Sequence, residues 1–270
     1  MDRRPIGIFD SGVGGLTVLK QVVRFLPNES IIYLGDTKHL PYGDKSKDAV
    51  IRFSIENTKF LISQDVKAIV IACNSASSVA TPVLKEKFNL PIVDVIEPTV
   101  ECVASDSPKS VLVIGTIRTI RSKVFNSKIT SLNSNISVSD RACPVFVPMV
   151  EEGAFIDKDS DLYKALEKTI SHYLADFKGK VDSVIMGCTH YPLIRDEIAS
   201  FIGDGVKLID PGECSAIKLK EILEQNEMLS DGYHKFTKLY VTDLSERTRE
   251  VVKMIMGNGI EIEEVNISET

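Results

Sequence analysis

The chain has 270 residues, 43% of them hydrophobic and 26% charged, which is the composition of an ordinary globular protein with one large or two modest cores. Its net charge is -6, and no basic tract interrupts the mixture of acidic and basic residues, so we expect neither a nucleic acid nor a membrane surface as partner. No apolar run has the length of a membrane span, and residues 1–12 lack the apolar core of a signal peptide. The expected location is therefore the cytoplasm.

Short apolar runs alternate with longer helical patterns along the chain. The runs that predict strands are 6–9, 31–34, 68–72, 92–96, 111–114, 183–186 and 206–209. A helical stripe in residues 161–177 is formed by Leu162, Ala165, Leu166, Thr169, Tyr173, Leu174 and Phe177. Residues 235–265 are typical of a strand, a helix and a strand that pack back on the first half. This alternation predicts an α/β fold built from parallel βαβ units.

The two halves of the chain also repeat one another at low resolution. In "KAIVIACNSAS" and "DSVIMGCTHYP" a strand runs into a cysteine, and an acidic residue next to a proline follows 24 residues after Cys73 and 22 residues after Cys188. Chance recurrence within an α/β protein is the alternative explanation. A true duplication would place the two cysteines on opposite walls of one cleft, because parallel strands present their functional loops at their carboxyl ends.

The cysteines are five in number, widely spaced and free of any Cys-x-x-Cys pair. This pattern predicts neither a disulfide framework nor a zinc ribbon, so a cysteine with a special role acts singly or in a distant pair. Cys102, Cys143 and Cys214 lack polar loop partners and are interpreted as structural. A metal site built from Cys188 and His190 would need further ligands, which the sequence does not supply at ligand spacing.

The stretch "AIVIACNSAS" at 68–77 ends a buried strand on a thiol and an amide. Taken alone, Cys73 is a small buried hydrophobe and Asn74 is a turn residue. Paired with Cys188, Cys73 is either a redox partner or one half of an acid and base pair. A disulfide needs Cα atoms within about 7 Å, which opposite walls around a ligand do not provide. Two thiols with a pKa of about 8.5 can instead remove a proton from one face of a carbon and deliver one to the other, without a cofactor.

Several loops are suited to holding the carboxylate of a substrate. Asn74, Ser75 and Thr189 adjoin the cysteines at expected helix starts, where backbone N–H groups bind anions. The glycine-rich turn "DSGVGGLTVLK" matches neither the dinucleotide nor the phosphate-loop pattern, but a backbone cradle for a carboxylate fits it. The loop "DTKHLPYGDKS" at 36–46 is more typical of a turn than of a site.

Charged residues near these loops are candidates to orient or tune the thiols. They are Asp10, His190 and one of the adjacent Glu151 and Glu152. Each of them, taken alone, is more typical of a solvated or structural position.

Six motifs occur together and in order over most of the chain: "FDSGVGGLTV", "LPYGDKS", "ACNSAS", "VIGTIRTI", "PMVEEG" and "GCTHYPL". As a set they resemble glutamate racemase, a family of cofactor-independent enzymes that interconvert L- and D-glutamate for bacterial cell-wall synthesis. The resemblance implies two similar α/β domains around a central cleft, usually in a homodimer. We expect the first domain to comprise residues 1–97 and 211–270, and the second to comprise residues 98–210.

The resemblance also implies roles for individual residues. Cys73 and Cys188 would be the catalytic acid and base, Cys73 serving D-glutamate and Cys188 serving L-glutamate. Asp10 would assist the first thiol, and His190 and Glu151 would lie near the second. The expected substrate-binding residues are Asp10, Ser11, Pro41, Tyr42, Gly43, Asn74, Ser75, Thr116, Thr119, Thr189 and His190. No metal or other cofactor is implied.

One position departs from the family pattern, and other functions stay open. Ser75 stands where the family usually has threonine. Serine keeps the hydroxyl but lacks the methyl group, which puts substrate affinity in doubt. An aspartate or hydantoin racemase of the same superfamily is the nearest alternative, although His190 after Thr189 favours glutamate. A binding role, such as the restraint of gyrase by some glutamate racemases, and a thiol redox function are the others.

Overall fold

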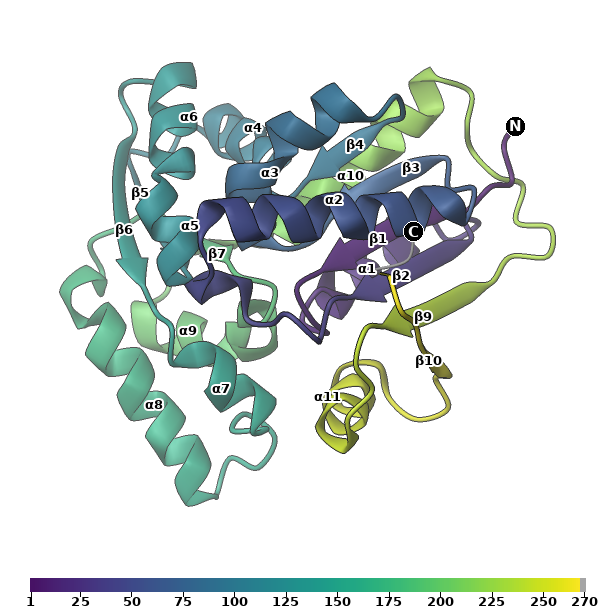
Figure 1. Cartoon of the computed structure of the whole chain (residues 1–270). Helices are drawn as coiled ribbons and strands as arrows, with labels where there is room; N and C mark the ends of the chain where they lie inside the picture. Colours follow the sequence, from purple (N-terminus) through teal and green to yellow (C-terminus); the bar gives the residue numbers. More distant parts are fainter. Residues whose placement is uncertain (268–270) are drawn as a thin grey trace.

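The structure, a computed structural model, describes residues 1–267 and contains two parallel β-sheets (Figure 1). The six strands of the first sheet lie in the order β10-β9-β2-β1-β3-β4, and the four of the second in the order β6-β5-β7-β8. The first sheet comprises β1 (Ile6–Asp10), β2 (Ile31–Gly35), β3 (Ala68–Ile71), β4 (Ile92–Asp94), β9 (Thr237–Val241) and β10 (Ile262–Glu264). The second comprises β5 (Ser110–Gly115), β6 (Ser137–Ala142), β7 (Ser183–Gly187) and β8 (Lys207–Ile209).

The strand order confirms the duplication that the sequence suggests. The run β2-β1-β3-β4 has the same topology as β6-β5-β7-β8, and every neighbouring pair in both runs is parallel. Strands β9 and β10 extend the first sheet beyond β2. The predicted fold class, two pseudo-symmetric parallel-sheet units, is therefore confirmed.

Helices cover both faces of each sheet, because strands buried on both sides need apolar cover above and below. On the first sheet, α1 (Leu16–Phe25), α10 (Pro211–Gln225) and α11 (Glu246–Met256) pack on one face, and α2 (Lys47–Ser63) and α3 (Asn74–Lys87) on the other. On the second, α7 (Phe146–Glu151), α8 (Asp161–Leu174) and α9 (Arg195–Ile202) face α4 (Glu97–Asp106) and α6 (Val124–Leu132) across the sheet. Four short elements complete the fold: α5 (Ile117–Ser122), η1 (Tyr42–Asp44), η2 (Ala175–Phe177) and η3 (Tyr191–Ile194).

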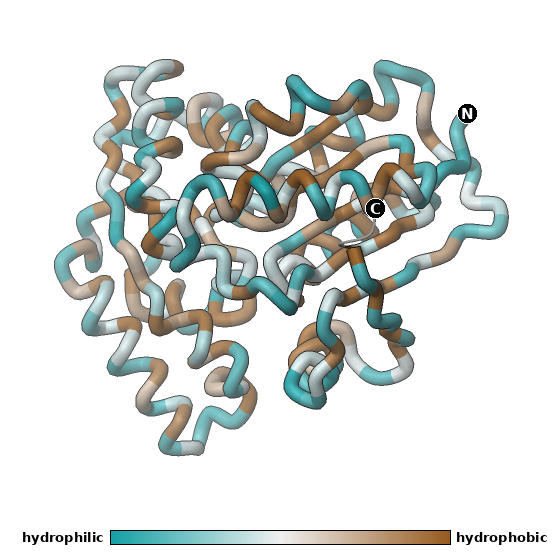
Figure 2. The backbone as a smooth tube through the Cα atoms, in the orientation of Figure 1, coloured by the Kyte–Doolittle hydropathy of each residue, from teal (hydrophilic) through white to brown (hydrophobic). Residues whose placement is uncertain are grey.

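Alternation along the strands produces the two cores of each sheet. On β1, Ile6 and Ile8 enter the cluster under α1, whereas Phe9 enters the cluster under α2. Figure 2 shows the consequence, with hydrophobic residues concentrated in the central strands and hydrophilic residues along the outer loops. No helix within residues 1–267 combines the length and apolar character needed to cross a membrane.

Two details differ from the sequence-based expectation. Strand β6 was not among the predicted runs, because this edge strand is polar and mostly half-exposed. The helical stripe of residues 161–177 is also rotated: α8 buries Leu166, Ile170 and Leu174, whereas Leu162 in its first turn is 38% exposed. Regular α-helix ends at Leu174, and residues 175–177 form the short helix η2.

The chain passes between the sheets twice. It leaves β4 for β5 through α4 and leaves β8 for β9 through α10, and these two helices pack against each other. As a result, the carboxyl ends of β1 and β3 lie near those of β5 and β7, where side-chain contacts join the two units.

Candidate active site

Cys73 follows β3 and is the N-cap residue of α3. Its sulfur accepts a hydrogen bond from the Ala76 N–H at 3.4 Å, and its thiol lies 3.5 Å from Ser11 Oγ. The residue is 5% exposed. Burial and the neighbouring Asp10 carboxylate raise the pKa of Cys73 to about 12. The thiol is therefore protonated at neutral pH and is placed to act as an acid.

Asp10, at the end of β1, is held by the glycine-rich turn that follows it. Its Oδ2 accepts hydrogen bonds from the N–H groups of Gly15 at 2.9 Å and Gly12 at 3.3 Å. A Cβ at position 15 would lie 2.5 Å from Asp10 Cβ, so the turn requires glycine there. Complete burial raises the pKa of Asp10, against the opposing effects of His190 and these N–H donors. The turn is therefore a cradle for the Asp10 side chain itself.

Cys188 lies directly after β7, at the position in the second sheet that matches Cys73 in the first. Its sulfur is 3.9 Å from His190 Nδ1, and His190 Nε2 is 3.0 Å from Glu151 Oε1. Burial disfavours the charged imidazole, but the hydrogen bonds to Cys188 and Glu151 outweigh it and raise the pKa of His190 to about 10. The imidazole therefore lies between the Cys188 sulfur and the Glu151 carboxylate, and its raised pKa favours the cationic ring.

The choice between the two adjacent glutamates is settled by position. Glu151, at the end of α7, is half-buried and contacts His190, whereas Glu152 is exposed and pairs with Arg247 at 2.8 Å. Burial opposes ionisation of Glu151, but the hydrogen bond with His190 outweighs it and lowers the pKa of this carboxyl group. Glu151 is the acid that faces the site.

Direct contacts join the two halves around the cysteines. Thr17 Oγ1 donates a hydrogen bond to the Thr189 carbonyl at 2.8 Å, and Ser75 Oγ lies 2.9 Å from Thr116 Oγ1. Thr116, the N-cap residue of α5, is in turn 3.1 Å from Thr119 Oγ1. The hydroxyl groups of Ser75, Thr116 and Thr119 thus form one chain across the boundary.

The predicted loop with Pro41, Tyr42 and Gly43 approaches the same boundary through its backbone. The Tyr42 hydroxyl donates to Asp36 Oδ2 at 2.5 Å and accepts from Asn57 at 3.1 Å, so it is already satisfied inside the core. Pro41 is exposed, and a Cβ at position 43 would lie 3.1 Å from Thr116 Cβ. The loop can therefore offer backbone groups to a ligand, but its phenol is engaged in holding the loop.

Sequence reasoning did not identify two polar residues that shape this loop. Asp36 receives the Tyr42 hydroxyl and also accepts from Thr242 at 2.9 Å. Arg118 on α5 donates to the Lys45 carbonyl and so ties the loop to the second half. Asp36 directly follows β2, at the start of the loop 36–46, and this position is the signal that was available in the sequence.

Two buried acceptors point to the kind of ligand that the site takes. Within residues 1–267, Asp10 Oδ1 and Asn74 Oδ1 have no hydrogen-bond partner. A buried acceptor without a donor is costly, so a ligand with N–H donors, such as an ammonium group, fits beside them. In the same part of the chain, no three or more His, Cys, Asp or Glu side chains are grouped as metal ligands.

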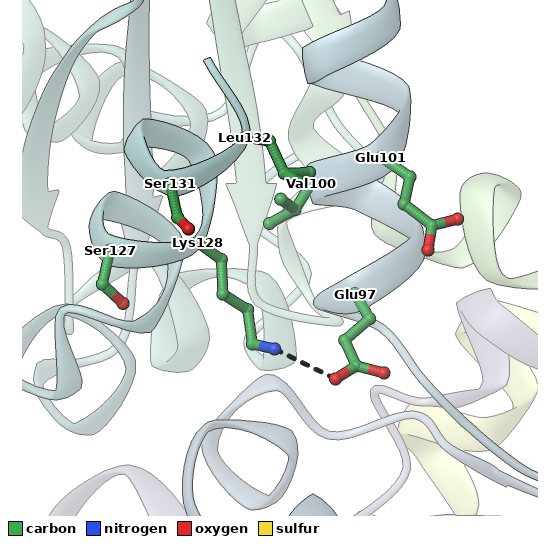
Figure 3. A pocket seen from close by; sticks show the side chains of 7 residues that line it. All are labelled: Glu97, Val100, Glu101, Ser127, Lys128, Ser131 and Leu132. Carbon is green, nitrogen blue, oxygen red and sulfur yellow. Dashed lines mark hydrogen bonds and ion pairs between the residues drawn. The ribbon is translucent and has the colours of Figure 1, made fainter. Parts of the chain in front are cut away.

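A separate cavity of about 630 Å³ lies between α4 and α6 (Figure 3). Lys128 reaches across it to Glu97 at 3.0 Å, and Leu132 contributes an exposed apolar wall. None of the residues that line it belongs to the predicted site. The chemistry described above is therefore not located there, despite the size of this cavity.

Comparison with known proteins agrees with this geometry. A family model described as Asp/Glu/Hydantoin racemase matches residues 11–218. The glutamate racemases of Aquifex aeolicus and Geobacter metallireducens are 42% and 44% identical over 257 and 266 residues, covering 95% and 96% of this chain and 95% of each relative. The solved glutamate racemase of Francisella tularensis subsp. tularensis SCHU S4, in complex with D-glutamate, matches 100% of both chains with a TM-score of 0.90 and 38% identity. The chain is thus an isomerase that belongs to the glutamate racemases of the Asp/Glu/hydantoin racemase family.

Proposed function

We propose that this protein interconverts L- and D-glutamate by a two-base mechanism in which Cys73 and Cys188 act on opposite faces of the Cα atom. The observation that carries the proposal is the equivalence of the two thiols. Each follows the corresponding strand of a duplicated sheet, and polar contacts between the halves surround both. The names of the relatives and the D-glutamate complex supply the substrate.

The surroundings of the thiols support opposite starting roles. With L-glutamate bound, Cys188 beside cationic His190 takes the Cα proton as the thiolate, and protonated Cys73 delivers its own proton to the other face. The products are D-glutamate, a Cys188 thiol and a Cys73 thiolate. Reaction of D-glutamate runs the same steps backwards. An acid and base pair is expected to consist of two titratable groups that have different surroundings.

Substrate contacts follow from the unsatisfied groups and helix starts. The ammonium group of glutamate is assigned to the free acceptors of Asp10 and Asn74. Its α-carboxylate is assigned to the N-terminus of α3, where Ser75 adds a hydroxyl. We assign the side-chain carboxylate to Thr189 and to the backbone of the loop that contains Tyr42 and Gly43, with Thr116 and Thr119 closing that side.

The wider role is also part of the proposal. D-glutamate is a component of peptidoglycan, so we assign the enzyme to cell-wall precursor synthesis in the cytoplasm, acting as a homodimer without a cofactor. We place the domain boundaries at residues 97/98 and 210/211, where α4 and α10 begin and the chain passes between the sheets.

The decisive test is incubation of the purified protein with L-glutamate in deuterated buffer without added cofactor. We expect the optical rotation to decay to zero while the Cα proton is replaced by deuterium, as observed by NMR. Exchange without loss of rotation would indicate a single working base and would contradict the two-base mechanism. Racemisation of aspartate in preference to glutamate would show that glutamate is not the preferred substrate.

A further inference from the structure

We infer that Arg247, on the C-terminal helix α11, is a positioning residue for the reaction because it holds the end of α7 that carries Glu151 against His190. Resting on the proposed function, this inference adds a residue from a segment in which the sequence shows no chemistry. Residues 235–265 form β9, α11 and β10 at the edge of the first sheet. In Figure 1, α11 lies below the first sheet, on the side of α7, and its Val251, Val252 and Ile255 pack in the core of that sheet.

Arg247 contacts the backbone of Glu151, the residue whose side chain pairs with His190. The Arg247 guanidinium donates to the Glu151 carbonyl at 2.5 Å and pairs with Glu152 Oε1 at 2.8 Å. The carbonyl groups in the last turn of a helix lack partners within the helix, and a cation at that end is favourable. Arg247 therefore caps α7 from the other half of the molecule.

A second contact shows that α11 packs against this turn. Gly153, with φ of +74°, follows the α7 end, and a Cβ there would lie 3.3 Å from Met254 Cε on α11. Met254 lies about two turns after Arg247 on the same helix. The side of α11 that faces the second half thus touches both ends of the turn at 151–153.

The charged partners of Arg247 contribute less than the carbonyl. The side chains of Glu152 and Glu250 are 64% and 60% exposed, so their pairs with Arg247 are screened by water. The bond to the Glu151 carbonyl is half-buried and directional. Its loss frees the short helix α7 to turn, which moves the Glu151 carboxylate away from His190.

The pKa of His190 reports this displacement with a definite sign. The titratable groups facing His190 are Cys188, Glu151 and Asp10, and Glu151 in turn faces Arg247. If Arg247 acted only through its positive charge, its removal would raise the pKa of His190, because the repulsion between the two cations is lost. If Arg247 instead holds Glu151 in place, its removal lowers that pKa from about 10 toward 6.5, because His190 loses a hydrogen-bonded carboxylate.

The experiment compares wild type, Arg247→Ala, Arg247→Lys and Arg249→Ala. Arg249 is exposed on the same helix, so its replacement removes the same charge as a matched control. Titration of ring-labelled histidine by NMR, with the His190 signal assigned from a His190→Asn sample, measures the pKa directly. Glutamate racemisation gives kcat and KM for the same four proteins.

We expect Arg247→Ala to lower the pKa of His190 and to reduce kcat by about 10- to 100-fold with little change in KM, as for a misplaced catalytic group. Arg247→Lys, which keeps one N–H donor for the carbonyl, recovers part of both losses, and Arg249→Ala matches wild type. An unchanged or raised pKa in Arg247→Ala, or an equal loss in Arg249→Ala, overturns the inference. The titration decides this even if wild type fails to racemise glutamate, an outcome that would instead overturn the proposed function.

Discussion

At the scale of single residues, the two cysteines have different neighbours although they hold equivalent positions. Cys73 is an N-cap thiol beside buried Asp10, and Cys188 is beside the imidazole of His190. The strands are duplicated, so the asymmetry comes from the residues at the strand ends and in the loops that follow them. The proposed two-base mechanism needs such a difference, because it starts with one thiol as the acid and the other as the base.

Replacing either thiol tests that division of labour. We expect Cys73→Ala and Cys188→Ala each to reduce racemisation by about 10²- to 10⁴-fold, the usual contribution of a positioned acid or base. Circular dichroism at the glutamate absorption band gives the rate, and thermal unfolding gives the control. A single variant that keeps near-wild-type turnover would contradict the assignment of that cysteine. Replacement of Cys102, which is half-exposed on α4, should leave turnover unchanged.

The protonation of His190 predicts how stability depends on pH. Its pKa in the folded protein is about 10 and its ordinary value is 6.5, so folding favours the protonated ring. The corresponding stabilisation is complete below pH 6.5 and is lost as the pH rises through about 10. We expect the free energy of unfolding to fall over this window more steeply in wild type than in His190→Asn.

Urea unfolding of both proteins at several pH values from 6 to 10.5 measures this difference. Other groups titrate in the same range, and the matched variant cancels their contribution. Parallel curves for the two proteins would show that His190 is not protonated in the folded state at neutral pH.

At the scale of helices and strands, a glycine sets how closely the two halves approach. Gly14 lies in the turn before α1, and a Cβ there would lie 2.4 Å from His190 Cε1 and 2.6 Å from Thr189 Oγ1. Those atoms belong to the loop after β7 in the other half. The turn "DSGVGG" thus serves close contact between the halves, in addition to holding Asp10.

Gly14→Ala is therefore expected to separate the halves rather than to unfold them. Forcing a methyl group into such a contact costs about 1–3 kcal/mol, and a small opening at the boundary relieves it. We expect a large loss of racemisation with a much smaller change in the thermal midpoint. Steady-state kinetics and calorimetry on the same sample test this. The control for the thermal midpoint is Gly12→Ala in the same turn, where a Cβ would make only an ordinary contact with Leu40 Cδ2 at 3.6 Å. Wild-type activity in Gly14→Ala would contradict the close approach.

The sequence predicted elements well where the signal is local. Seven apolar runs became strands, because strands buried on both faces are recognisable as short stretches of Ile, Val and Leu. Polar edge strand β6 gave no such signal. The motifs also brought together Asp10, Cys73, Cys188 and His190, because each lies at the end of a strand or within three residues after it.

Contacts between segments far apart in the chain could not be predicted from the sequence. Arg247 acts on Glu151 across 96 positions, and Arg118 reaches Lys45 across 73. The partners of such residues depend on how the two sheets are packed, and no periodicity encodes that. The choice of Glu151 over Glu152 likewise required the orientation of α7, since neighbouring helical residues point about 100° apart.

At the scale of the whole molecule, the site is closed. The contacts Thr17 to Thr189 and Ser75 to Thr116 join the halves, and Cys73 and Cys188 are only 5% and 6% exposed. We expect glutamate to enter when the two units separate, with α4 and α10 as the connections between them. Such opening and closing commonly limits turnover in enzymes whose sites lie between domains.

Alkylation of the thiols measures this opening. Cys102 on α4 is partly exposed, and a hydrogen bond from Cys214 lowers its pKa, so we expect iodoacetamide to modify Cys102 first. Cys73 and Cys188 should react much more slowly, at a rate set by separation of the halves, and more slowly still with saturating D-glutamate. Gly14→Ala should accelerate both without affecting Cys102. Peptide mapping by mass spectrometry follows each site separately, and reaction of Cys188 as fast as Cys102, or without protection by glutamate, would mean that the site is open in solution.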